Sequence, residues 1–327
     1  MGLPFIVCLK ALWQSRSNQV GLNRRDFLKK SAIMGIGGIV GASSLNDLIR
    51  AENLPDLTVV QGPDPSKTVA KAIETMGGIG RYVSKGDTVV LKPNMAWDRT
   101  PEQAANTNPQ VVASVVKLCF EAGASTVKVL DNPCDDARRS YVQSGIAEAA
   151  RELGAKTPYM DSRKFKKTGI NGEVLKTWEV YRDIIEADKL INIPVAKHHS
   201  LAGVTLGLKN WMGAIGGWRS RLHWKLDKSL ADLAAFFKPS LTILDCVNVL
   251  TANGPQGGSL SYVKRLNTVV VGIDQVAVDA FGAKLFETAA GRPETANRAR
   301  RYIETAAMRG IGRMDLENLR IVTLNLS

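Results

Sequence analysis

The chain has 327 residues, of which 45% are hydrophobic, 6% aromatic and 23% charged. This composition is typical of a folded globular protein and excludes an intrinsically disordered chain. The formal net charge of +12 favours anionic partners, but the basic residues are scattered among acidic ones, so we expect no nucleic acid among those partners.

An export leader is the first element that the sequence predicts. A basic segment, Asn23–Lys30, precedes a glycine-rich apolar stretch, Ser31–Leu45. With the adjacent Arg24 and Arg25 it resembles a twin-arginine export signal, which implies the twin-arginine export machinery as a partner and a periplasmic location. The apolar stretch is short for a membrane span, so we expect only transient membrane contact through the leader. Ala51 is the best candidate for cleavage; an uncleaved leader would be a membrane anchor.

Residues 1–53 are therefore assigned to the signal and leader, and residues 54–327 to a single domain. Within that domain, short β-branched runs alternate with longer helical stretches, which predicts an α/β fold with a largely parallel, doubly wound sheet that can include some mixed strands. The expected strands are Leu57–Gly62, Thr88–Asn94, Thr126–Asn132, Lys189–Val195, Leu241–Cys246, Asn267–Asp274 and Leu319–Asn325.

Two long helices are expected between these strands, over Asn108–Ala124 and Tyr141–Ala155. Both have apolar residues at helical spacing and a glycine near the end. A small hairpin is expected over Phe165–Val180, with its turn at Asn171-Gly172. The segment Leu201–Gly213 also spaces its apolar residues like a helix.

The cysteines do not form a recognisable site. Cys8, Cys119, Cys134 and Cys246 include no C-x-x-C pair and no spacing typical of a zinc or iron–sulfur centre. Removal of the leader with Cys8 leaves an odd number, so we predict no disulfide framework and at least one free thiol.

Polar residues follow several of the expected strands, at the edge where ligands bind in open α/β sheets. Any one of them has the alternative role of a turn or helix cap, and we expect Asp274, together with Asp279, to cap the following helix. Coincidence at five strand ends favours a site. The residues concerned are Lys92, Asn94, Asp131, Asn132, Lys197, His198, His199, Asp245 and Asp274.

All three histidines, His198, His199 and His223, lie within 26 residues of one another. Histidine ligates metals and moves protons near neutral pH, and Asp131 and Asp245 could complete a metal site or orient an imidazole. A structural histidine without a ligand is the alternative for each one alone. A glycine-rich loop, 251–258, could close over a ligand or bind phosphate through its amides, but it is not a P-loop; a surface turn is its alternative.

Taken together, these segments resemble the family called domain of unknown function 362. The resemblance spans roughly residues 57–323 and is carried by "VVLKPN", "EAGASTVKVLDNP", "INIPVAKHHSLAGVTLGLKNWMG", "LTILDCVNVLTANGPQGG" and "VVGIDQVAVDAFGAKL". It implies a site at Lys92, Asn94, Asp131, Lys197, His199, Thr205, Lys209, Asn210 and Asn253. Some relatives carry ferredoxin-like cysteine runs, but this chain lacks that quartet, so no self-contained cysteine-ligated iron–sulfur cluster is expected.

We therefore expect an exported enzyme of this family, with a redox-related role left open, that binds a metal ion or an anionic small molecule; its cofactor is unknown. A periplasmic carrier that holds an anionic ligand or cofactor without turnover is the alternative, and a structural partner of an exported redox complex is a third. The catalytic candidates are His199, Lys197, Lys209 and Lys92. The substrate-binding candidates are Asn94, Thr205, Asn210 and Asn253, and the metal-ligand candidates are His198, His199, His223, Asp131 and Asp245.

Overall fold

A nine-stranded sheet runs through the part of the chain that the computed structural model describes, residues 54–327. The predicted leader, with Arg24 and Arg25, lies outside the described residues. Along the sheet the strand order is β11-β1-β10-β9-β6-β2-β3; off this path, β7 pairs with β9, and β8 pairs with β7. The main strands are β1 (Leu57–Gln61), β2 (Thr88–Pro93), β3 (Thr126–Val129), β6 (Lys189–Ile193), β9 (Leu241–Leu250), β10 (Val263–Gly272) and β11 (Ile321–Asn325).

The sheet is largely parallel, as predicted. β3, β2, β6 and β9 are parallel neighbours, and β1 is parallel to β11. β10 is one exception, because it is antiparallel to both β1 and β9. β7 (Val195–His199) continues from β6 and pairs in parallel with β9, while the short β8 (Gly203–Thr205) returns antiparallel to β7.

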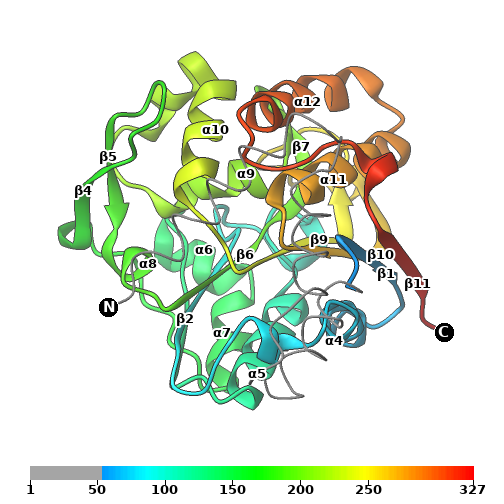
Figure 1. Ribbon diagram of the computed structural model, residues 1–327, viewed down its shortest axis with the longest axis horizontal. Coiled ribbons are helices and arrows are strands. Elements are labelled where there is room, and N and C mark those ends of the chain that lie inside the picture. The colour runs from blue at the N-terminus through cyan, green and yellow to red at the C-terminus, as the bar shows by residue number, and fades with distance from the viewer. Residues whose placement is uncertain (1–53) are drawn as a thin grey trace, which may run out of the picture. The chain divides into compact units, whose positions relative to one another are not determined.

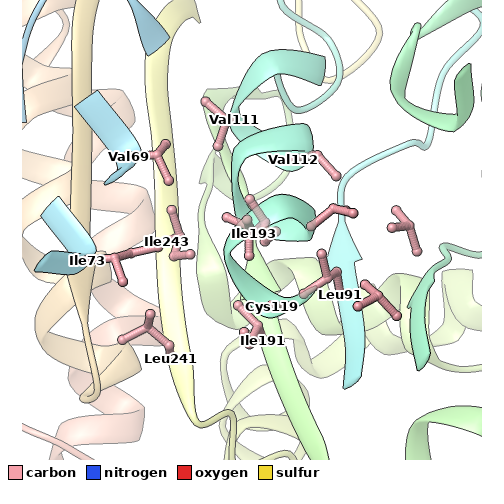
Figure 2. Close-up of a cluster of buried hydrophobic side chains, with 14 of the residues drawn as sticks. Val69, Ile73, Leu91, Val111, Val112, Cys119, Ile191, Ile193, Leu241 and Ile243 are labelled. Carbon is pink, nitrogen blue, oxygen red and sulfur yellow. The ribbon is translucent and has the colours of Figure 1, made fainter. Parts of the chain in front are cut away.

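Helices cover both faces of the sheet, which confirms the predicted α/β class (Figure 1). α4 (Pro65–Thr75), α5 (Pro109–Glu121) and α7 (Ile146–Glu152) pack on one face, and α10 (Leu226–Phe236), α11 (Gln275–Ala290) and α12 (Pro293–Met308) on the other. Figure 2 shows the first of these layers, in which side chains of α4 and α5 interdigitate with those of the strands. The labelled residues are Val69, Ile73, Val111, Val112, Cys119, Leu91, Ile191, Ile193, Leu241 and Ile243.

The hairpin predicted over Phe165–Val180 is present, whereas the long helix predicted over Tyr141–Ala155 is not. β4 (Phe165–Gly169) and β5 (Thr177–Tyr181) pair antiparallel, and Asn171 has a φ of 55° in the connection. The helix expected over 141–155 is instead two, α6 (Ala137–Gln143) and α7. Gly145 separates them with a φ of 70°, a left-handed conformation that a helix cannot continue through.

The segment after β7 also differs from the prediction of a helix over Leu201–Gly213. It forms β8 and then the single turn α9 (Gly207–Asn210). Gly203 has a φ of 77°, and a Cβ there would lie 2.2 Å from the carbonyl oxygen of Thr295. Asp279 fixes the start of α9, because its carboxylate accepts the N–H groups of Gly207 (2.7 Å) and Leu208 (2.9 Å). Asp274 caps α11 as expected, whereas Asp279 serves this other turn.

Within residues 54–327, we find no helix with the length and hydropathy of a transmembrane segment.

Candidate functional site

A cavity of about 490 Å³ lies where β2, β3 and β7 end and α9 begins. Four cationic side chains line it against one carboxylate, that of Asp131. The other polar residues of the lining are mostly amides, hydroxyls and imidazoles. The charged and polar lining residues are Lys92, Asn94, Asp131, Asn132, Cys134, Lys197, His199, Ser200, Thr205, Lys209, Asn210, Arg219, Ser220 and His223.

Asp131 is already paired with one of these cations. Its Oδ1 lies 2.8 Å from Nζ of Lys92, and both side chains are buried. Asp131 Oδ2 accepts the N–H of Met95 at 2.7 Å. The remaining donors of Lys92 Nζ go to the carbonyl of Pro93 (2.7 Å) and to Oδ1 of Asn210 (3.0 Å). The floor of the cavity is therefore a buried ion pair held in place by hydrogen bonds to both of its members.

A row of amides connects this ion pair to the second lysine. Asn210 donates from Nδ2 to Oδ1 of Asn192 (2.8 Å) and to the carbonyl of Lys92 (3.0 Å), which fixes which end of its amide is oxygen. Asn94 donates to Oδ1 of Asn210 at 3.2 Å, so its own Oδ1 is left to accept from Nζ of Lys197 at 3.1 Å. Each amide is thus oriented by its neighbours, and the lysines hold defined positions.

Lys197 and Lys209 are buried without a carboxylate partner. Lys197 Nζ donates to Asn94 and to the carbonyl of Ala105 and lies 5.9 Å from the centroid of the Trp97 ring. Among the described residues, Lys209 Nζ has the thioether of Met212 as its one partner, at 3.6 Å. Neither amine forms an ion pair within residues 54–327. Burial lowers the pKa of Lys197 to about 7 and that of Lys209 to about 8.

The two cavity histidines present opposite hydrogen-bonding groups. Nδ1 of His199 accepts the N–H groups of Leu201 (3.1 Å) and Ala202 (3.2 Å), so the proton must sit on Nε2. Nδ1 of His223 faces the carbonyl of Ser220 at 3.1 Å and must donate to it, which leaves Nε2 as an unpartnered acceptor. The rings stack with centroids 6.0 Å apart. Burial and the nearby lysines lower the pKa of His199, so the ring is neutral.

Several lining residues are absent from the site predicted from the sequence, among them Cys134, Arg219 and Trp97. Cys134 is an exposed free thiol that lines the cavity only three positions after Asp131. Arg219 donates to the carbonyls of Asn132 and Pro133, each at 2.6 Å, and so anchors the loop that carries Cys134. Trp97 supplies an aromatic wall. The loop position of Cys134 after a polar strand end was the one available signal.

The structure brings most of the predicted substrate and catalytic residues together. His199, Lys197, Lys209, Lys92, Asn94, Thr205 and Asn210 all line the cavity. Thr205 is 3% exposed, and its Oγ1 has no hydrogen-bond partner in the described part of the chain. Asn253 does not line the cavity: it is exposed and has a φ of 53°, which identifies a turn residue in the 251–258 loop.

Two of the predicted metal ligands lie away from the cavity. His198 bonds through Nδ1 to the N–H of Gly254 at 3.0 Å. Asp245 was expected on the shared rim, but its carboxylate accepts the N–H groups of Asn108 (2.7 Å) and Val247 (2.9 Å), beside the start of α5. Burial raises the pKa of Asp245 to about 6.

The five predicted metal ligands are therefore not assembled into one site. Residues 54–327 contain no group of three or more His, Cys, Asp or Glu side chains that could hold a metal ion. The remaining candidates are His199, His223 and Asp131, and Asp131 is occupied by Lys92. Four cationic side chains around the same space repel a metal cation and attract an anion.

A family model described as domain of unknown function (DUF362) matches residues 89–284, which include the three cavity lysines, both stacked histidines and Asp131. The chain belongs to the DUF362 family. A curated relative is the thylakoid-associated protein of Synechocystis sp., to which this DUF362 protein is 28% identical over 196 residues. The match covers 57% of this chain and 60% of the relative, so the chain spans less than two thirds of that protein's length.

Solved structures resemble this DUF362 protein only distantly. The lactate racemase apoprotein from Thermoanaerobacterium thermosaccharolyticum has 13% identity and a TM-score of 0.45, over 70% of this chain and 56% of that one. A protein from Thermotoga maritima has 12% identity and a TM-score of 0.40, over 70% and 58% of the two chains. At these values the similarity carries no argument about ligand or reaction.

Proposed function

We propose that this protein binds a small molecule with a carboxylate, phosphate or similar anionic group in the cavity, and that it moves a proton on that molecule. The observation that carries the proposal is the pair of buried amines of Lys197 and Lys209, which line one cavity and have no carboxylate partner. The single carboxylate available, Asp131, is already paired with Lys92.

The energetics favour an anion as the missing partner. Transfer of an ammonium group from water to a protein interior costs several kcal/mol unless a counter-charge and hydrogen bonds compensate for it. Here the two amines titrate near neutrality, which is the signature of that cost. A bound anion would supply the counter-charge, protonate both lysines and be held by charge-assisted hydrogen bonds.

Proton transfer is the chemistry that the same groups support. A catalytic acid or base works best when its pKa lies near the working pH, and burial brings the pKa of Lys197 to about 7. Neutral His199 offers an Nε2–H donor, and His223 offers an Nε2 acceptor. A ligand oxygen could accept from His199 while a ligand hydroxyl or amine donates to His223. Lys197 is our candidate for the acid or base, and His199 and Lys209 for binding and charge stabilisation.

A carrier would use the same anion site without turnover. The two functions differ in what they require of Lys197: a carrier needs only its charge, whereas proton transfer needs an amine that loses and regains a proton. Lys197→Arg keeps the charge and cannot deprotonate, so it should abolish turnover in an enzyme and leave a carrier active.

The bound molecule can be identified directly. Protein purified under low-salt conditions would be denatured, and the supernatant analysed by mass spectrometry for small anions and by elemental analysis for metals. We expect a stoichiometric organic anion or phosphate, absent from the Lys197→Met/Lys209→Met variant. An empty wild-type cavity at low salt, or a stoichiometric metal without an anion, would contradict the proposal.

We also propose that the protein is exported by the twin-arginine route, on the sequence of residues 23–45. Arg24→Lys/Arg25→Lys should retain the protein in the cytoplasm, because the export machinery reads the arginine pair. Cell fractionation tests this, with Lys29→Arg/Lys30→Arg as a matched control that keeps charge and the pair. Full export of the double-lysine variant would refute the proposal.

A further inference from the structure

Two exposed tryptophans stand beside the mouth of the cavity. Trp218 is 65% exposed and Trp224 is 70% exposed, although the indole ring of tryptophan is large and mostly apolar. Their rings meet edge to face, with centroids 5.5 Å apart. Leu201, 59% exposed, lines the cavity together with Trp218 and an adjoining hollow together with Trp224. The three side chains therefore form one small apolar island at the entrance.

Cationic residues surround this island. The segment 218–225 reads "WRSRLHWK" and contains Arg219, Arg221 and Lys225 but no acidic residue. The guanidinium of Arg221 lies 5.8 Å from the centroid of the Trp224 ring. The adjoining hollow adds Arg298 to the same surface, and its remaining charges form two ion pairs, Lys228–Glu173 and Arg301–Asp227. Basic and aromatic residues thus alternate here, a local pattern that plays no part in the predicted site. We call Leu201, Trp218, Arg221, Trp224 and Lys225 the tryptophan face.

Such a combination matches the chemistry of a lipid headgroup region. Tryptophan concentrates at membrane interfaces because its ring is apolar while its indole N–H stays hydrated, and lysine and arginine beside it attract anionic lipids. A protein partner fits less well. Stable protein interfaces bury about 800 Å² on each side around an apolar centre from which lysine is depleted, whereas this face is three apolar side chains whose charged neighbours are more often basic than acidic.

We propose that the tryptophan face docks on an anionic lipid surface. Trp218, Trp224 and Leu201 enter the headgroup region, and Arg221 and Lys225 contact lipid phosphates. The mouth of the cavity then faces the membrane, so that a ligand with an anionic head can enter from it. This docking is independent of the predicted leader, and it does not require the proposed chemistry of the cavity.

Vesicle sedimentation tests the docking with the full chain. The probes are unilamellar vesicles of phosphatidylcholine alone and of equimolar phosphatidylcholine and phosphatidylglycerol. We expect binding to the anionic vesicles that weakens with salt, and a loss of at least about tenfold in the Trp218→Ser/Trp224→Ser variant. The matched control is Leu260→Ser/Met308→Ser, which removes two apolar side chains of similar exposure (60% and 81%) on other elements and should bind like the wild type.

Quenching by brominated lipid gives a second readout, and it is measured in a Trp13→Phe background because the predicted leader carries a tryptophan of its own. Brominated phosphatidylcholine in the anionic vesicles should quench wild-type tryptophan fluorescence, and Trp218→Ser/Trp224→Ser should lose that quenching. Because both rings are exposed, the variant should unfold at the wild-type temperature. Wild-type vesicle binding by the tryptophan variant, or quenching that persists in it, overturns the proposal. Absence of wild-type binding also overturns it and leaves this face to a protein partner.

Discussion

Nζ of Lys92 lies 2.8 Å from Oδ1 of Asp131 in the floor of the cavity, with side-chain exposures of 0% and 1%. Gly213 makes this approach possible. A Cβ at position 213 would lie 1.8 Å from Asp131 Oδ1 and 2.7 Å from Lys92 Nζ. Three segments distant in the sequence, β2, the end of β3 and the turn after α9, therefore meet at one buried charge pair.

Loss of one member of the Lys92–Asp131 ion pair should destabilise the fold. Asp131→Asn keeps the shape but leaves Lys92 as an uncompensated buried charge, which costs about 3–5 kcal/mol in the free energy of unfolding. Urea denaturation would measure it. Glu74→Gln, which breaks the exposed Lys71–Glu74 pair, is the control and should leave the midpoint unchanged. A midpoint for Asp131→Asn equal to the control would show that the ion pair does not support the cavity floor.

A methyl group at position 213 should have a similar effect by steric means. Gly213→Ala pushes a Cβ into the Asp131 carboxylate, and overpacking of this kind costs about 1–3 kcal/mol. Gly80→Ala is the matched control, because a Cβ there meets nothing within 4 Å. Thermal unfolding of the two variants tests the difference. Equal melting temperatures would mean that the turn after α9 can shift to accommodate the methyl group at little cost in stability.

Replacement of Lys197 by an apolar residue should stabilise the empty protein. Lys197→Met removes an unpaired buried amine, and we expect a net gain of about 1–3 kcal/mol at pH 7 after the loss of its hydrogen bonds to Asn94 and Ala105. A residue that is costly for folding and retained in a cavity is the pattern expected of a functional group. Chemical denaturation checks the sign, and a large loss of stability would show that the amine is structural.

The pH dependence of that gain has a defined direction. In the unfolded chain Lys197 titrates near its ordinary pKa of 10.5, and in the folded chain near 7. Between these values the unfolded state holds a proton that the folded state lacks, so the free energy of unfolding of the wild type rises with pH across this window. Below pH 7 both states hold the proton, and Lys197 adds no further pH dependence. The advantage of Lys197→Met should therefore be greatest at or below pH 7 and shrink toward pH 10. An advantage independent of pH would contradict the lowered pKa.

His199 is the histidine on which ligand binding should depend. Asn at position 199 can place an oxygen near Nδ1 and keep the loop bonds to Leu201 and Ala202, while it removes the Nε2–H donor. We expect His199→Asn to fold and to lose activity, and His199→Ala also to lose about 1–3 kcal/mol because two backbone N–H groups are left unpaired. His198→Asn, outside the cavity, is the control. Equal activity of both Asn variants would remove His199 from the site.

The sequence predicted the strands and much of the site for one reason. β-branched runs locate parallel strands, and parallel strands deliver their last residues to one edge, so the pattern alone was enough to group Lys92, Lys197 and His199. The prediction for Asp245 was wrong because the strand was expected to end at Cys246, whereas β9 continues to Leu250 and leaves Asp245 inside the strand.

The remaining site residues lie on loops, where the sequence has no periodic hydrophobic pattern. Arg219, Cys134 and Trp218 reach the cavity through chain reversals after α9 and β3, which no hydrophobic pattern specifies. The expected helix over Leu201–Gly213 failed for a related reason, because the contact of Asp279 with Gly207 and Leu208 joins positions some 70 residues apart. Local spacing cannot encode such a contact.

Calorimetric titration with sulfate tests the central claim most directly, because sulfate stays fully ionised across the pH range in which Lys197 and Lys209 titrate. We expect one site per chain in ligand-free protein at pH 6.5, weaker binding as the pH rises through 8, and no binding in Lys197→Met/Lys209→Met. Lys284→Met, on the exposed side of α11, should bind like the wild type. Sulfate binding that survives in the double variant, or that is absent from the wild type at pH 6.5, would contradict the assignment of this cavity to an anion.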